Sequence, residues 1–72
     1  MTTEEFITKL TEIMDTDVTL NLSTKLADVE DWDSLSMVSF YSFCNTTRKH
    51  PVMPEEIKSA KTVEDLFKLA NA

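Results

Sequence analysis

The chain has 72 residues, of which 42% are hydrophobic and 28% charged, and it carries a formal net charge of −6 at pH 7. This length allows one small domain and leaves no room for a core together with a deep catalytic cleft, so we expect a single domain over residues 1–72 that is not an enzyme. The composition is globular, and no apolar run approaches the roughly 20 residues of a membrane span. The acidic balance argues against nucleic acid as a partner and favours basic protein surfaces.

The amino-terminal residues 1–5 are acidic where a secretory signal would be basic, and no apolar signal core follows them. We therefore expect a cytoplasmic location. The single cysteine, Cys44, cannot form an intramolecular disulfide, and its position on a helix predicts a small buried side chain.

An amphipathic helix is predicted from Thr3 to about Met14, because apolar residues recur there at helical spacing. Thr2 or Thr3 is the expected N-cap, and two acids in the first turn suit the helix dipole. The apolar face consists of Phe6, Ile7, Leu10, Ile13 and Met14.

Residues 15–33 lack helical periodicity. Their spaced aliphatic residues predict a long extended loop that packs across the helices, since a lone strand would have no partner. Glycine is absent from the chain, so we expect the helices to end at proline, asparagine or polar sequence rather than at left-handed glycine caps. The aliphatic residues of the loop are Val18, Leu20, Leu22 and Leu26.

A second helix is predicted from Ser34 to about Thr47, ending before the basic residues 48–50 and Pro51. Helical steps place four apolar residues on one arc, which we expect to face the core. This arc consists of Met37, Val38, Tyr41 and Cys44. Opposite this arc lie Leu35, Ser39, Ser42 and Thr46. The outer face of the helix, made up of Ser36, Ser39, Ser42, Asn45 and Thr46, carries no charge.

Two shorter helical segments complete the predicted fold. Residues 54–57 predict one turn with Pro54 at its first position. The last helix is predicted to begin at Thr62, with Asp65 as its capping-box partner, and to bury Val63, Leu66, Phe67 and Ala70. The fold class is therefore all-α: an up-down bundle of three main helices plus a short third helical turn, with a long loop between the first and second helices.

Ser34 is the candidate functional residue. It follows a short acidic loop, residues 28–33, and opens an apolar helix, where unpaired N–H groups and the positive end of the helix dipole favour a phosphodiester. The pair Asp33 and Ser34 also fits an ordinary helix cap, since aspartate and serine are preferred there. A calcium loop does not fit the acidic segment, which lacks the mid-loop glycine and contains Trp32. Trp32 is expected to anchor the loop by packing, or to cover the root of a group attached to Ser34.

These segments together resemble the acyl carrier proteins over nearly the full chain. The resemblance rests on the first helix, the long loop, Asp33-Ser34-Leu35, the Pro-Glu-Glu turn and the final Thr-Val-Glu-Asp-Leu segment. It implies that Ser34 receives a 4'-phosphopantetheine arm from coenzyme A through a phosphopantetheinyl transferase, and that the thiol of the arm holds acyl groups as thioesters. It also implies that Asp33 assists attachment by helping to bind the magnesium of the transferase, with no stable metal site in the carrier.

The chain departs from this family on the outer face of the second helix. Many acyl carrier proteins carry a row of glutamates there, whereas this face is uncharged. We therefore expect Leu35, Ser39 and Ser42 to make short-range partner contacts, while Asp31 and Glu55 help to attract acyl-loading and acyl-transferring enzymes with basic surfaces. This favours a monomeric carrier with dedicated enzymes in a specialised lipid, polyketide or glycan-modifying pathway. The initiator methionine and the length suggest a free-standing protein, although an excised domain would look the same.

Three aromatic residues of the second helix, Phe40, Tyr41 and Phe43, add bulk where the resemblance suggests smaller aliphatic residues. The cargo is therefore predicted to be short or polar, or to stay outside the bundle. An aminoacyl or peptidyl carrier is an alternative, although such carriers more often have glycines before the serine. The alternative outside this class is a small helical interaction module without cofactor, in which Ser34 is only a helix cap.

Overall fold

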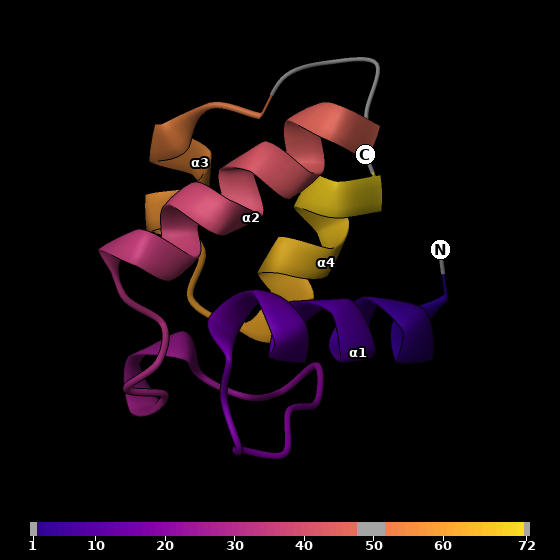
Figure 1. Cartoon of the computed structure of the whole chain (residues 1–72), viewed down its shortest axis with the longest axis vertical. Helices are drawn as coiled ribbons and strands as arrows, with labels where there is room; N and C mark the ends of the chain where they lie inside the picture. The colour runs from indigo at the N-terminus through magenta and orange to yellow at the C-terminus, as the bar shows by residue number, and fades with distance from the viewer. Residues whose placement is uncertain (1, 48–51, 72) are drawn as a thin grey trace.

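The chain folds as an all-α structure, which confirms the predicted class. The computed structural model describes residues 2–47 and 52–71, whose arrangement is shown in Figure 1. Within these ranges the helices are α1 (Thr3–Met14), the short 3-10 helix η1 (Leu26–Asp28), α2 (Ser34–Thr47), α3 (Pro54–Ser59) and α4 (Val63–Asn71). The described residues contain no strand, and an isolated antiparallel bridge joins Lys25 to Thr62.

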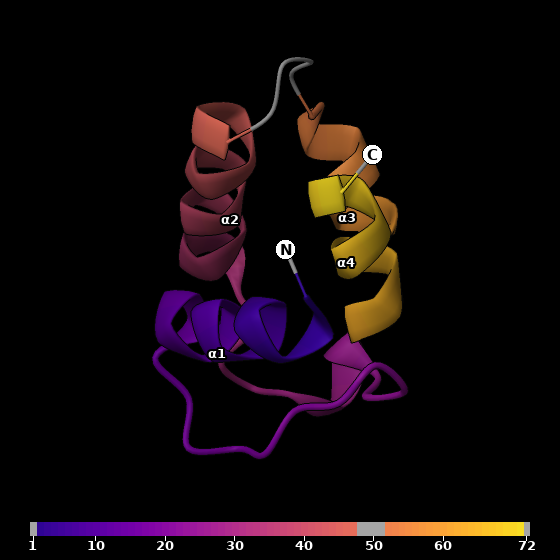
Figure 2. The same ribbon diagram turned by 90° about the vertical axis from the view of Figure 1, so that its right-hand side faces the viewer.

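Figure 2 shows α2 on one side of the molecule, α3 and α4 on the other, and α1 crossing beneath them. Residues 15–33 pass below α1 before the chain enters α2. No helix in the described ranges is long and apolar enough to cross a bilayer. The up-and-down order of a bundle stays a prediction. The basic residues 48–50 and Pro51, predicted to mark the end of the second helix, lie outside the described residues.

Side chains cap the start of α1, and a backbone turn at Asp15 closes its end. Thr2 and Glu5 form a capping box, in which the Glu5 N–H donates to Thr2 Oγ1 (3.2 Å) and the Thr2 N–H donates to Glu5 Oε1 (2.9 Å). At the other end, Asp15 adopts a left-handed conformation with φ 50° and ψ 50°. The helix α1 therefore ends without glycine, as expected, but at a left-handed aspartate, which the sequence did not indicate. Aspartate tolerates this conformation better than most residues, and Asp15 takes the position that glycine usually fills.

The core lies where α1, α2 and α4 meet around Phe6. The fully buried rings of Phe6 and Phe40 have centroids 6.2 Å apart and lie nearly perpendicular, while the ring of Phe67 is 5.3 Å from that of Phe6. Edge-to-face pairs of this kind stabilise a core beyond the burial of their area. The buried hydrophobic residues are Phe6, Leu10, Met14, Leu20, Leu26, Val29, Phe40, Cys44, Val52, Ile57, Val63 and Leu66.

The loop between α1 and α2 contributes side chains to this core. Leu20 and Leu26 are buried as predicted, and Leu22 is partly buried against the core. Val18, however, is 44% exposed, and Val29 takes a buried position that the sequence did not indicate. In a β-strand, the alternation of apolar and polar residues tells which side chains face the core, because successive side chains point to opposite sides. An irregular loop has no such regular geometry, so the same alternation does not predict which side chains are buried.

Backbone hydrogen bonds hold this loop against the start of α4. The Leu26 N–H donates to the Lys61 carbonyl (2.9 Å). In the reverse direction, the Val63 N–H donates to the Thr24 carbonyl (3.0 Å) and the Glu64 N–H donates to that of Leu22 (3.0 Å). These bonds satisfy polar groups of both segments and place Lys25 beside Thr62.

The helix α2 turns a different face to the core from the predicted one. Its buried residues are Ser36, Phe40 and Cys44, spaced four residues apart, whereas Val38 is 62% and Tyr41 38% exposed. The predicted arc is therefore wrong by roughly a quarter turn about the helix axis, although Cys44 is buried as expected. The reason is that apolar residues lie on all sides of α2, so their periodicity does not select one face.

The last two helices follow the predicted signals closely. Pro54 opens α3, which extends to Ser59, beyond the predicted single turn. The helix α4 begins at Val63, and Thr62 lies just before it as the cap, in the position that the predicted capping box requires. The predicted capping box is confirmed, since the Asp65 N–H donates to Thr62 Oγ1 (3.3 Å) and the Thr62 N–H donates to Asp65 Oδ2 (3.2 Å). Val63 and Leu66 are buried, while Phe67 and Ala70 are partly buried.

Candidate functional site

Ser34 is the first residue of α2, and its side chain is exposed. The residue that caps the helix is Asp33: its carbonyl accepts the first helical hydrogen bond from the Met37 N–H (3.0 Å), and its Oδ1 accepts from the Ser36 N–H (2.9 Å). Within the described residues, the Ser34 hydroxyl makes no hydrogen bond. The suggestion that Ser34 is itself the cap is therefore wrong, and its hydroxyl is left accessible at the positive end of the helix.

The carboxylate of Asp33 is stabilised in its ionised form. The backbone N–H of Ser36 holds the pKa of Asp33 below its usual value, and the side chain of Ser36 and the backbone of Leu35 act in the same direction. A carboxylate that accepts hydrogen bonds from a helix N-terminus stays charged at neutral pH. Asp33 therefore places a negative charge at the start of α2, on the residue that precedes Ser34.

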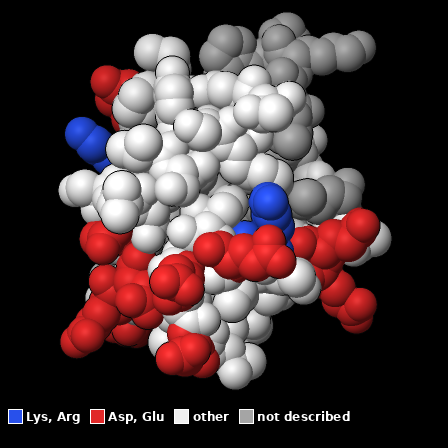
Figure 3. Space-filling model, in the orientation of Figure 1, with Lys and Arg blue, Asp and Glu red and all other residues white. Residues whose placement is uncertain are grey.

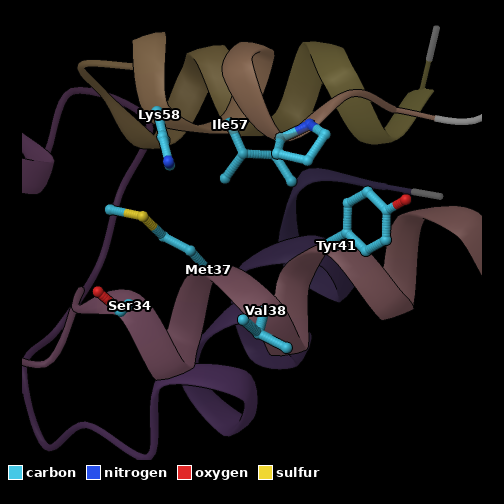
Figure 4. Close-up of a pocket in the computed structure, with 7 residues that line it drawn as sticks. Ser34, Met37, Val38, Tyr41, Ile57 and Lys58 are labelled. Carbon is cyan, nitrogen blue, oxygen red and sulfur yellow. The ribbon is translucent and has the colours of Figure 1, made fainter.

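An apolar groove of about 330 Å³ begins at Ser34 and runs between α2 and α3 (Figure 4). In Figure 4, the Ser34 hydroxyl lies at one end of this groove, and the amine of Lys58 points across it from α3 toward α2. The other lining residues are Met37, Val38, Tyr41, Pro54 and Ile57. The arc of α2 that was predicted to face the core thus forms, through Met37, Val38 and Tyr41, one wall of this groove.

Large apolar side chains on α2 are exposed next to Ser34. Leu35 is 76% exposed, and Val38 and Tyr41 follow it at steps of three residues along one stripe. Figure 3 shows that the surface over α2 is almost free of charge, while the acidic residues gather over the loop and α1. An exposed apolar stripe bounded by acidic residues is typical of a protein interaction site.

The predicted partner-contact residues are all exposed. Ser39 and Ser42 lie on the outer surface of α2, Asp31 lies in the loop before it, and Glu55 lies in the first turn of α3. The predicted polar face is nevertheless narrower than expected, because two of its members have structural roles: they are Ser36 and Asn45.

Ser36 is buried, and its hydroxyl donates to the carbonyl of Asp31. Asn45 is partly buried, and its Oδ1 accepts a hydrogen bond from the Val52 N–H (2.8 Å). These side chains satisfy backbone groups of the loop before α2 and of the segment before α3. Their polar groups are therefore engaged within the fold.

The indole of Trp32 is partly buried and packs edge-on against Phe40, with ring centroids 6.0 Å apart. This contact confirms the expected packing role of Trp32 in the loop. Among the described residues, no three side chains of histidine, cysteine, aspartate or glutamate converge as a metal-binding group.

The sequence did not indicate that Lys58, Pro54 and Ile57 belong to the site. They reach it because α3 packs beside the preceding helix α2, a tertiary contact that has no local sequence signal. No protein-family model, curated protein or solved structure matches the chain. The geometry around Ser34 is therefore what supports an assignment of function.

Proposed function

We propose that the protein is an acyl carrier protein, built as the up-down bundle with a long first loop that such carriers have, and that Ser34 is its attachment point for 4'-phosphopantetheine. The observation that carries this proposal is the Ser34 hydroxyl: it is exposed, it opens a helix that Asp33 already caps, and it borders an apolar groove. A serine that served only the helix would have its oxygen engaged with a backbone N–H.

The residues around Ser34 fit the proposed arm chemically. The free N-terminal end of α2 and the ammonium group of Lys58 suit the negative phosphodiester, while Met37 and Val38 offer apolar contact to the uncharged part of the arm. When bound, the arm supplies a thiol that holds acyl groups as thioesters.

Attachment is a group transfer that the transferase catalyses. Ser34 Oγ forms a bond to the β-phosphorus of coenzyme A, the pyrophosphate bond breaks, and adenosine 3',5'-bisphosphate leaves. The proton of the Ser34 hydroxyl passes to a base of the transferase. Asp33, ionised and adjacent, assists by helping to hold the magnesium that neutralises the pyrophosphate in the encounter complex.

Partner enzymes dock, in this proposal, on the stripe that begins at Leu35. Leu35 with Val38 and Tyr41 supplies apolar contact, and Ser39 and Ser42 supply hydrogen bonds at its edge. Asp31 and Glu55 belong to the acidic groups that raise the encounter rate with basic surfaces on acyl-loading and acyl-transferring enzymes. The carrier itself is a non-enzymatic, monomeric, cytoplasmic protein in this scheme.

The uncharged outer face of α2 favours dedicated enzymes over general fatty-acid elongation. A docking surface with apolar contacts and few charges selects partners by shape, because long-range attraction comes only from the acidic groups around it. Loading and elongation of this protein by a purified fatty-acid synthase is expected to be much slower than that of the synthase's own carrier. Equal rates would contradict the specialised role.

The carrier function is tested by intact mass. Incubation with coenzyme A, magnesium and a broad-specificity phosphopantetheinyl transferase should add one phosphopantetheine to the wild type and none to Ser34→Ala. Ser59→Ala is the matched control, because Ser59 is an exposed helical serine outside the proposed docking stripe, and it should be modified like the wild type. No mass gain on the folded wild type would contradict the proposal.

A non-covalent interaction module is the second candidate, and the exposed stripe of Leu35, Val38 and Tyr41 is the observation that favours it. Such a module would bind a partner equally well with Ser34→Ala. An aminoacyl or peptidyl carrier would be modified at Ser34 but would accept amino acids rather than acyl groups from its loading enzyme.

A further inference from the structure

A second groove, of about 550 Å³, lies next to the one that begins at Ser34. Its walls come from the loop around η1, from α2, and from the segment that joins α3 to α4. Three of its lining residues are lysines, namely Lys25, Lys58 and Lys61, and its larger apolar lining residues are Leu26, Trp32 and Met37.

The charge of this groove is opposite to that of the molecule. The chain has 13 acidic and 7 basic residues, yet three of the basic residues and none of the acidic ones line the groove. The ion pair found among the described residues joins Lys9 to Glu12 (3.9 Å), so the groove lysines have no carboxylate within ion-pair distance in that part of the chain. Three unpaired positive charges around one hollow favour an anion in it.

The walls that carry two of these lysines are fixed by backbone bonds. Lys25 is paired with Thr62 in the isolated bridge, and the Leu26 N–H donates to the carbonyl of Lys61 (2.9 Å). Lys25 and Lys61 therefore approach the groove from two segments that are already tied together. Because this arrangement exists before a ligand binds, little backbone ordering opposes binding.

The apolar part of the groove restricts the kind of anion. Leu26 is buried in the core, and Trp32 is held edge-on against Phe40. A small, fully hydrated ion would leave these side chains without contact, whereas an anionic group on a short hydrocarbon chain contacts both them and the lysines.

The two grooves share Met37 and Lys58 as lining residues, so they lie side by side on the surface. We propose that the second groove holds the free carboxylate of the carried acyl group, and that the cargo is a short dicarboxylic acid attached through its other carboxyl as a thioester. This inference rests on the proposed carrier function. It names the cargo class that Lys25 and Lys61 select, while Lys58 faces the phosphodiester of the arm. The cargo stays outside the core, which the ring of Phe40 fills.

In the test, the transferase attaches a complete acyl-phosphopantetheine arm to Ser34. The donor is either succinyl-coenzyme A or an analogue in which the free carboxylate of the succinyl group is replaced by an amide. The two cargoes have nearly the same shape, but only the succinyl group is charged. NMR shifts of the Trp32 indole N–H and the Met37 methyl group report the position of the cargo. We expect the succinyl form to shift both signals and the amide form to leave them near those of the unacylated arm. Salt should weaken the effect, because charge attraction is screened.

The variant Lys25→Gln with Lys61→Gln should lower the ratio of docked to free cargo by roughly two- to fivefold for each lysine removed. Lys9→Gln with Lys68→Gln changes the net charge equally outside this groove and should preserve the shifts. These side chains are exposed, so both variants should fold. Circular dichroism checks this before loading.

Each other outcome has a definite meaning. Equal shifts for the succinyl and amide forms would overturn the inference, because the groove would then bind the cargo without recognising its carboxylate. Equal shifts in the unacylated arm would show that the lysines hold its phosphate instead, which also overturns it. Loading at Ser34 without any shift refutes the cargo assignment alone, whereas the absence of a mass gain refutes the carrier function on which it rests.

Discussion

Replacing Phe40 with leucine measures how far the inner face of α2 supports the fold. The Phe40 ring is fully buried, and its centroid lies 6.2 Å from that of Phe6, 6.0 Å from that of Trp32 and 6.2 Å from that of Phe43. At about 0.5 kcal/mol for each lost ring pair, these contacts amount to about 1.5 kcal/mol. Leucine is smaller by about 25 Å³, and at roughly 24 cal/mol per Å³ the cavity adds about 0.6 kcal/mol. We therefore expect the free energy of unfolding to fall by about 2 kcal/mol.

A domain of this length has a stability of about 4 to 11 kcal/mol, so Phe40→Leu should remain folded. The loss is measured as a lower urea midpoint with an unchanged slope, followed by circular dichroism. The control is Val38→Ala: Val38 lies on the same helix but is 62% exposed, and its replacement should change stability by less than about 0.5 kcal/mol. An equal or larger loss for Val38→Ala would refute the orientation of α2.

Three further outcomes follow from local contacts. Asp15→Gly should raise stability by about 0.5 to 1 kcal/mol in urea unfolding, because glycine adopts the left-handed conformation at φ 50° without strain; a loss would show that the Asp15 side chain matters more than its backbone. The ionised Asp33 cap stabilises the fold at pH values above 3.8, the ordinary pKa of aspartate, and this stabilisation is lost as the pH falls through the lower pKa of the folded state. Asp33→Asn keeps an oxygen that can cap the helix but does not titrate, so the dependence of Tm on pH should be flatter in this range. An unchanged pH profile would contradict this role of Asp33. Asn45→Ala removes the acceptor of the Val52 N–H and should cost about 1 to 3 kcal/mol, whereas Asn45→Asp, which retains an acceptor oxygen, should cost less; equal losses would argue against this bond.

Signals that act within a few residues were read correctly from the sequence. Thr2 marks the start of α1 as one of its two expected caps, and Thr62 with Asp65 marks the start of α4, because a cap is completed by residues at most three positions apart. Pro54 marks the start of α3 in the same local way. The all-α class followed from these signals and from the clear apolar faces of α1 and α4.

The tertiary structure decided the orientation of α2 and the composition of the grooves. Apolar residues surround α2, so only packing against Phe6 and Trp32 turns Phe40 inward and leaves Val38 outside. Ser36 and Asn45 look like surface residues in sequence, yet backbone groups of distant segments need them as partners.

The sequence by itself determined that a helix with apolar residues begins at Asp33 and Ser34, because an N-cap depends only on residues that are close neighbours in the chain. Only the folded chain decided that Lys58 stands across a groove from α2 and that Lys25 and Lys61 gather around the next one. The physical reason is that charges and apolar walls from separate segments meet through long-range packing and backbone pairing, for which no local pattern of residues gives a signal.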